Sequence, residues 1–138
     1  MKIKILTEQL DYKENKLDEI LLITEATVKK EDNMLIIDYK ENAEDPDDDI
    51  NTRIRLTDNK LVMTKIGIVS STIEFEPGKR FNSIYSTGYG NFKMVITTKS
   101  VDYKINEDGT GYINLKYMIK IGESDSYINR LNITLYMD

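Results

Sequence analysis

The chain has 138 residues, of which 40% are hydrophobic and 31% charged. This length allows one sizeable hydrophobic core and is too short for two ordinary domains, so we predict a single domain over residues 1–138. Nucleic-acid binding requires a clustered positive surface, and the net charge of −5 argues against such a partner. No apolar run approaches the roughly 20 residues of a membrane helix, so we expect no membrane partner.

The residue types that are absent limit the chemistry. The chain has no His and no Cys, which removes the commonest general base, the thiol nucleophile and the usual zinc and haem ligands. Lys4 and Glu8 interrupt the apolar region that a signal peptide would need near the start of the chain. We therefore predict a cytoplasmic protein that is not an enzyme and carries no cofactor.

An alternation of apolar and polar residues with a period of two begins at the N-terminus and is typical of β-strands. The first predicted strand is Lys2–Tyr12, and its pattern slips at Leu10, which indicates a bulge. The segment Asp18–Lys29 also fits a helical spacing. Its β-branched pairs Ile23-Thr24 and Thr27-Val28 favour a strand instead.

Between the next strands lies an acidic loop, Asn42–Asp49, which we expect to be exposed and dispensable for folding. Asp45, Asp47 and Asp49 have the first spacings of a calcium-binding loop. The sixth position of that motif is Ile50 instead of Gly, and the twelfth is not Glu, so we expect a solvated loop without calcium.

The rest of the chain reads as strands joined by short turns. Turn chemistry is strongest at Glu76-Pro77-Gly78-Lys79 and Asn106-Glu107-Asp108-Gly109. The remaining predicted strands are Met34–Glu41, Ile50–Thr57, Leu61–Ile66, Ile68–Glu76, Phe81–Thr87, Phe92–Tyr103, Gly111–Ile121 and Leu131–Met137.

About nine or ten sequential antiparallel strands would leave exposed edges in a flat sheet, and closure removes those edges. We therefore predict an all-β fold, an up-and-down antiparallel β-barrel, with a two-sheet sandwich as the alternative. The long strand Gly111–Ile121, around which the predicted sheet is organised, supplies an apolar face to the barrel interior.

Four inward residues are candidates for lining a ligand cavity: Met63, Tyr85, Met94 and Tyr117. Met and aromatic side chains at such positions most often fill a small barrel, so packing is the favoured interpretation. For Tyr117 in particular we expect a core position, with the hydroxyl reaching a polar group near the barrel wall or mouth.

Several motifs resemble the YwiB-like bacterial family. They include Phe75-Glu76-Pro77-Gly78, Tyr85-Ser86-Thr87-Gly88-Tyr89-Gly90, Thr98-Lys99-Ser100-Val101 and Leu131-Asn132-Ile133-Thr134, and the earlier half matches mainly through Asp38-Tyr39-Lys40-Glu41. The resemblance implies a calycin-like barrel, the group that includes lipocalins and fatty-acid-binding proteins, and implies no activity. The chain has no Trp, so the Gly-x-Trp signature of true lipocalins is absent.

Two functional hypotheses follow, and both rank above a third, an enzyme that uses carboxylates or Lys. The first is a small, largely apolar ligand bound in the barrel interior. The second is a protein-interaction or assembly module, with a protein partner or a homodimer, and a filled barrel. An enclosed cavity of at least ~300 Å³, the low end for ligand sites, would favour the first hypothesis, and a filled interior would favour the second.

Overall fold

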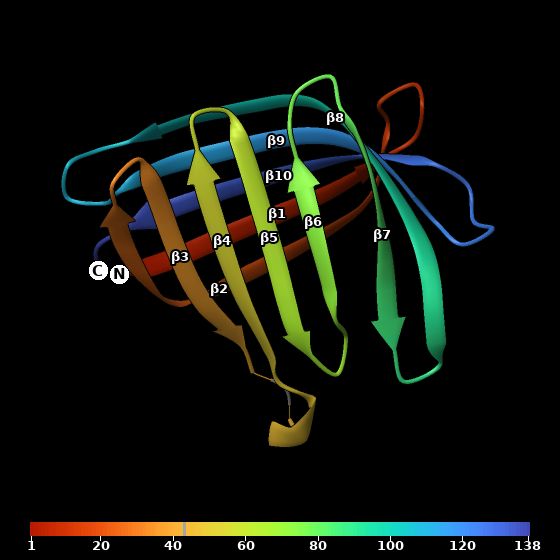
Figure 1. Cartoon of the computed structure of the whole chain (residues 1–138), viewed down its shortest axis with the longest axis horizontal. Coiled ribbons are helices and arrows are strands. Elements are labelled where there is room, and N and C mark those ends of the chain that lie inside the picture. Colours follow the sequence, from red (N-terminus) through yellow and green to blue (C-terminus); the bar gives the residue numbers. More distant parts are fainter. Residues whose placement is uncertain (43) are drawn as a thin grey trace.

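The structure, a computed structural model, describes residues 1–42 and 44–138. Ten strands follow one another along this described part of the chain (Figure 1). They are β1 (Lys2–Leu10), β2 (Lys16–Glu31), β3 (Met34–Glu41), β4 (Ile50–Thr57), β5 (Lys60–Gly67), β6 (Ser71–Phe75), β7 (Arg80–Thr87), β8 (Gly90–Ile105), β9 (Gly111–Ile121) and β10 (Tyr127–Tyr136).

The strands form one antiparallel sheet in the order β6-β5-β4-β3-β2-β1-β10-β9-β8-β7. Consecutive strands are therefore paired, except β6 and β7, which form the two ends of the sheet, and β1 pairs with β10. The two ends of the sheet meet where the backbones of Ser70 and Ser86 exchange two hydrogen bonds of 2.9 Å, and Ser83 Oγ donates to the Thr72 carbonyl at 2.6 Å. The predicted up-and-down barrel is confirmed, in a nearly closed form.

The core lies between the facing walls of this barrel. Six inward residues of β9 and β10 are fully or almost fully buried, as the alternation predicted: Ile113, Leu115, Tyr117, Leu131, Ile133 and Leu135; the predicted inward residues Ile119 and Ile121 are only half-buried. The Tyr117 ring packs on Phe75 from β6, across the barrel, with ring centroids 4.8 Å apart. This contact joins two strands that are distant in the sheet order, so the interior is spanned by side chains.

The long strand β2 pairs with two different neighbours. Its first part, Lys16–Glu25, pairs with β1, and its second part, Ala26–Glu31, pairs with β3. In Figure 1 the two neighbours diverge from β2, with β3 running away from the first part of the strand. The register between β1 and β2 shifts at Gln9 and Leu10, which confirms the predicted bulge.

Several segments differ from the predicted boundaries: β10 begins at Tyr127 instead of Leu131, and β2 and β8 extend beyond both of their predicted ends. β6 begins at Ser71 instead of Ile68, after a bend at residues 68–69. Within the predicted acidic loop, where residue 43 lies outside the described residues, Pro46–Asp48 form a 3₁₀ turn. The Asp45 carboxylate accepts the Asp47 amide at 3.0 Å and caps the turn, and Lys40 pairs with Asp49 at 3.2 Å. The loop is thus locally ordered by its own carboxylates.

No helix in the described residues is long and apolar enough to cross a membrane.

Gly111 opens β9 at a point where the backbone of β8 approaches closely. A Cβ added there would overlap the Lys104 carbonyl oxygen. We expect Gly111→Ala to lower the free energy of unfolding by about 1–3 kcal/mol, the usual range for overpacking, in urea denaturation. A Cβ at Gly88 meets open space, so Gly88→Ala is the matched control; equal effects of the two changes would contradict the predicted clash.

Candidate functional site

The four residues predicted as candidate ligand-lining positions lie in the packed core or against it. Met63, Met94 and Tyr117 are buried in one continuous apolar cluster, and Tyr85 packs against that cluster half-buried. None of the four lines the largest hollow of the described structure. Their predicted role in ligand binding stays a prediction, and their observed role is packing.

Among these four residues, Tyr117 alone has a side-chain hydroxyl with a hydrogen-bond partner in the described structure. It accepts a hydrogen bond from Asn129 Nδ2 at 3.4 Å, as the sequence led us to expect. Burial raises the pKa of the Tyr117 phenol, so the group is neutral at physiological pH. The neutral phenol and amide suit a core that admits no charge.

A small hollow lies beside Asn129, on the inner side of β1, β2, β9 and β10. Its volume is about 240 Å³, and Thr7, Ile20, Ile119 and Tyr127 contribute to its wall. Asn129 Oδ1 is buried there without a hydrogen-bond donor among the described residues. The hollow is smaller than the roughly 300 Å³ at the low end of ligand sites.

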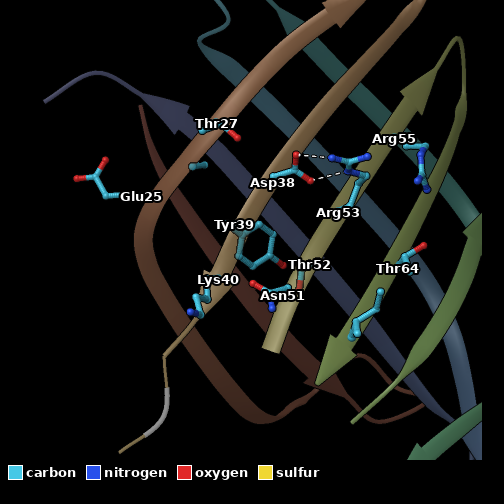
Figure 2. Close-up of a pocket in the computed structure, with 12 residues that line it drawn as sticks. Glu25, Thr27, Asp38, Tyr39, Lys40, Asn51, Thr52, Arg53, Arg55 and Thr64 are labelled. Carbon is cyan, nitrogen blue, oxygen red and sulfur yellow. Dashed lines mark hydrogen bonds and ion pairs between the residues drawn. The ribbon is translucent and has the colours of Figure 1, made fainter. Parts of the chain in front are cut away.

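The largest hollow lies on the outer side of the barrel, across β2, β3, β4 and β5, with a volume of about 690 Å³ (Figure 2). We call it the sheet groove. Side chains alternate between the faces of a strand, so the outward residues of β3 and β4 form its charged part. These outward residues are Asp38, Lys40, Asn51, Arg53 and Arg55.

A bidentate ion pair fixes the middle of the sheet groove. Asp38 and Arg53 face each other in the β3–β4 register. Arg53 Nε donates to Asp38 Oδ1 at 2.7 Å, and Arg53 Nη2 donates to Asp38 Oδ2 at 2.9 Å (Figure 2). These hydrogen bonds lower the pKa of the Asp38 carboxyl, so the carboxylate and the guanidinium hold each other in place.

Arg55 lies two residues further along β4 and therefore on the same outer face. Its cross-strand neighbours are Ile36 on β3 and Val62 on β5. Ile36 is buried although it faces outward. Among the described residues Arg55 makes no ion pair of its own. The Arg53 hydrogen bonds lower the pKa of the Asp38 carboxyl and the charge of Arg55 lowers it further, so two guanidinium groups share one carboxylate in the sheet groove.

The second distinctive surface is the first part of β2. Lys16–Glu25 pairs with β1 on one side, and no strand of the described residues pairs with its other side. We call this segment the open edge. It exposes large apolar side chains on both faces: Leu17, Ile20, Leu21 and Ile23, of which Ile20 is 64% exposed.

The last part of β8 also has one unpaired side, but its side chains differ. Residues 99–105 pair only with β9, and they include the exposed charged residues Lys99, Asp102 and Lys104. Charged side chains, Lys above all, protect a sheet edge from adding another strand. The open edge of β2 lacks this protection in its central stretch, from Ile20 to Ile23.

The sequence carried a signal for the open edge that the strand prediction did not use. Apolar residues occupy both parities between Leu17 and Ile23, which is the reason a helix competed there. The Asp38–Arg53 pair had no such signal, because it depends on the register between two strands.

Comparisons with known proteins agree with the fold. A family profile described as "Domain of unknown function (DUF1934)" matches residues 3–133. The crystal structure of the ywiB protein from Bacillus subtilis is similar, with a TM-score of 0.78, 18% sequence identity, and coverage of 96% of this chain and 89% of that chain. No curated protein matches the chain.

Tyr117 distinguishes a packed interior from a ligand cavity. We expect Tyr117→Ala to lower the free energy of unfolding by about 3–5 kcal/mol, because the change removes a buried ring that contacts Phe75. Urea denaturation measures this loss. Leu115→Ala is the buried reference and Tyr89→Ala, at a residue that is 97% exposed, is the surface control; a Tyr117 variant as stable as the surface control would point to an open cavity.

Proposed function

The chain belongs to the DUF1934 family, whose function is unknown, and we propose that it is a non-catalytic, cytoplasmic assembly module. Its working surface is the open edge of β2, and the occupant is a second copy of the same chain. The observation that carries the proposal is the exposed apolar stretch from Ile20 to Ile23 on a strand segment that is unpaired on one side.

An unpaired strand edge presents a row of backbone donors and acceptors, and natural proteins usually protect such edges. Here the edge is long, because Lys16–Glu25 spans the whole β1–β2 pairing. Adding a strand would satisfy the free backbone groups and would also bury Leu21 and Ile23 on one face and Ile20 on the other. Both contributions favour association.

The sequence of the open edge is complementary to itself in antiparallel pairing. When Leu21 lies opposite Leu21 of the second copy, Ile20 lies opposite Leu22 and Ile23 lies opposite Glu19. Directly opposite residues share a face, so the apolar centre packs on itself. No carboxylate lies opposite another carboxylate in this register, and such a pairing of like charges would be unfavourable.

The charged residues at the two ends of the open edge leave its centre free of competing ion pairs. Lys16 pairs with Glu19, and Glu25 pairs with Lys2 on β1 with Nζ and Oε1 2.7 Å apart. These carboxylates are therefore already matched within the chain. An apolar, neutral centre remains for the second copy, which is why a like chain fits better than a strongly charged partner.

A second candidate function is a small, largely apolar ligand at the inner hollow. The observation that favours it is the buried Asn129 Oδ1 without a donor, which a ligand hydroxyl or amide could satisfy. Native mass spectrometry of the protein purified from its own host tests this candidate, because a retained small molecule adds a defined mass to the chain.

The assembly proposal predicts a dimer of twice the 16.0 kDa chain mass. Leu21→Lys places a charge at the centre of the paired edges, so we expect the variant to sediment as a monomer in analytical ultracentrifugation over a concentration series. Ile84→Lys is the matched control, because Ile84 on β7 is 50% exposed against 53% for Leu21.

Circular dichroism and urea denaturation of both variants show whether each one is folded. A wild-type chain that remains monomeric at every concentration would contradict the proposal. So would a dimer that both lysine variants leave unchanged, since the interface would then lie elsewhere.

A further inference from the structure

We propose that the sheet groove is a binding site for a small organic oxyanion, a phosphate or a carboxylate attached to an apolar body, and that Arg55 and Arg53 hold the oxyanion. This site lies on the outer face of β2–β5 and is separate from the open edge. The inference does not depend on self-association, and each can fail without the other.

Arg53 is held in a fixed position. Its Nε and Nη2 donate to the two oxygens of Asp38, and a guanidinium carries five N–H donors in one plane. The Nη1 donors therefore remain, oriented by the ion pair, without a partner among the described residues. A preorganised donor loses little side-chain entropy when a ligand binds, which is the property that a recognition residue needs.

Arg55 supplies the unmatched positive charge. It is two residues from Arg53 on the same strand face, so their Cα atoms are roughly 6–7 Å apart. The two guanidinium groups can thus approach one oxyanion together. In Figure 2 Arg55 lies next to Arg53 along β4, at the rim of the hollow.

The other charges near the sheet groove are matched within the chain. Glu25 pairs with Lys2, and Lys40 pairs with Asp49, with Nζ and Oδ2 3.2 Å apart. Asp38 is matched by Arg53. The remaining positive charge at Arg55 therefore gives the groove a preference for an anion.

The rest of the lining fits a ligand that is partly apolar. Thr27, Asn51 and Thr64 offer hydroxyl and amide groups, and Ile66 offers apolar surface. The volume of about 690 Å³ lies in the ordinary range for small-molecule sites, roughly 300–1,000 Å³. A net charge of −5 disfavours an extended polyanion, so the ligand is small.

Isothermal titration calorimetry with two pairs of probes tests the proposal. One pair is adenosine 5′-monophosphate and adenosine, and the other is octanoate and octanamide. Within each pair the organic body is shared, largely polar in adenosine and apolar in the octanoyl chain, and only one member is an anion. We expect the anion to bind at least about tenfold more tightly than its neutral counterpart in at least one pair. Binding of only one anion would identify the oxyanion as phosphate or carboxylate.

Arg55→Gln removes the unmatched charge, and we expect it to weaken binding of the anion by about tenfold or more. Lys79→Gln is the control, because it removes one exposed positive charge from the β6–β7 turn, outside the groove lining. Backbone amide shifts of β4 and β5 in NMR titrations of the wild-type chain locate the anion independently of any variant.

Absence of binding by both anions would overturn the proposal. Equal affinity for anion and neutral probe would overturn it as well, and so would unchanged affinity in Arg55→Gln. Shifts confined to strands other than β2–β5 would place the anion outside the sheet groove and have the same consequence.

Discussion

The double pairing of β2 is the constraint on which the barrel depends. A strand of 16 residues is hydrogen-bonded to β1 along its first part and to β3 along its second part. Because β2 pairs first with β1 and then with β3, it connects the two walls of the barrel without a break in the sheet. As a consequence, the ten residues of the open edge have no strand of the described chain on their second side, because β3 runs in another direction.

The filling of the interior follows from the same architecture. The two walls are close enough for Phe75 on β6 to contact Tyr117 on β9, so the space between them is occupied by side chains. Met94 and Met63 are buried in the same core cluster, where flexible thioether side chains commonly fill irregular gaps. The two larger candidate surfaces, the open edge and the sheet groove, therefore lie outside this packed interior, and the inside keeps the small hollow beside Asn129.

Much of the fold could be predicted because a period of two is a strong signal over long strands. The inward residues of β9 alternate cleanly from Ile113 to Tyr117, and the slip at Leu10 marked a real bulge. The open edge could not be predicted from local pattern alone, because a residue such as Ile20 has the inward parity of a core position. Ile20 is exposed because β3 does not pair with this part of β2, and that depends on the topology of the whole sheet.

The sheet groove was beyond sequence reasoning for a related reason. Arg53 and Asp38 are 15 positions apart and meet only through the register of β3 with β4. In the sequence, Arg53 and Asp38 each look like an ordinary outward residue of a separate strand. Within the described structure Arg55 likewise has no ion pair because its cross-strand neighbours are the apolar residues Ile36 and Val62. The sequence of β4 alone does not show which residues these neighbours are.

Amide hydrogen exchange of β2 as a function of protein concentration tests most directly whether the open edge is the working surface. Amides of residues 16–25 that point away from β1 should exchange rapidly in dilute protein and become protected as concentration rises. Amides of residues 26–31 that point toward β3 are paired within the chain and should be protected throughout. If the amides of residues 16–25 that point away from β1 exchange rapidly at all concentrations, this result would contradict a role for the open edge in assembly.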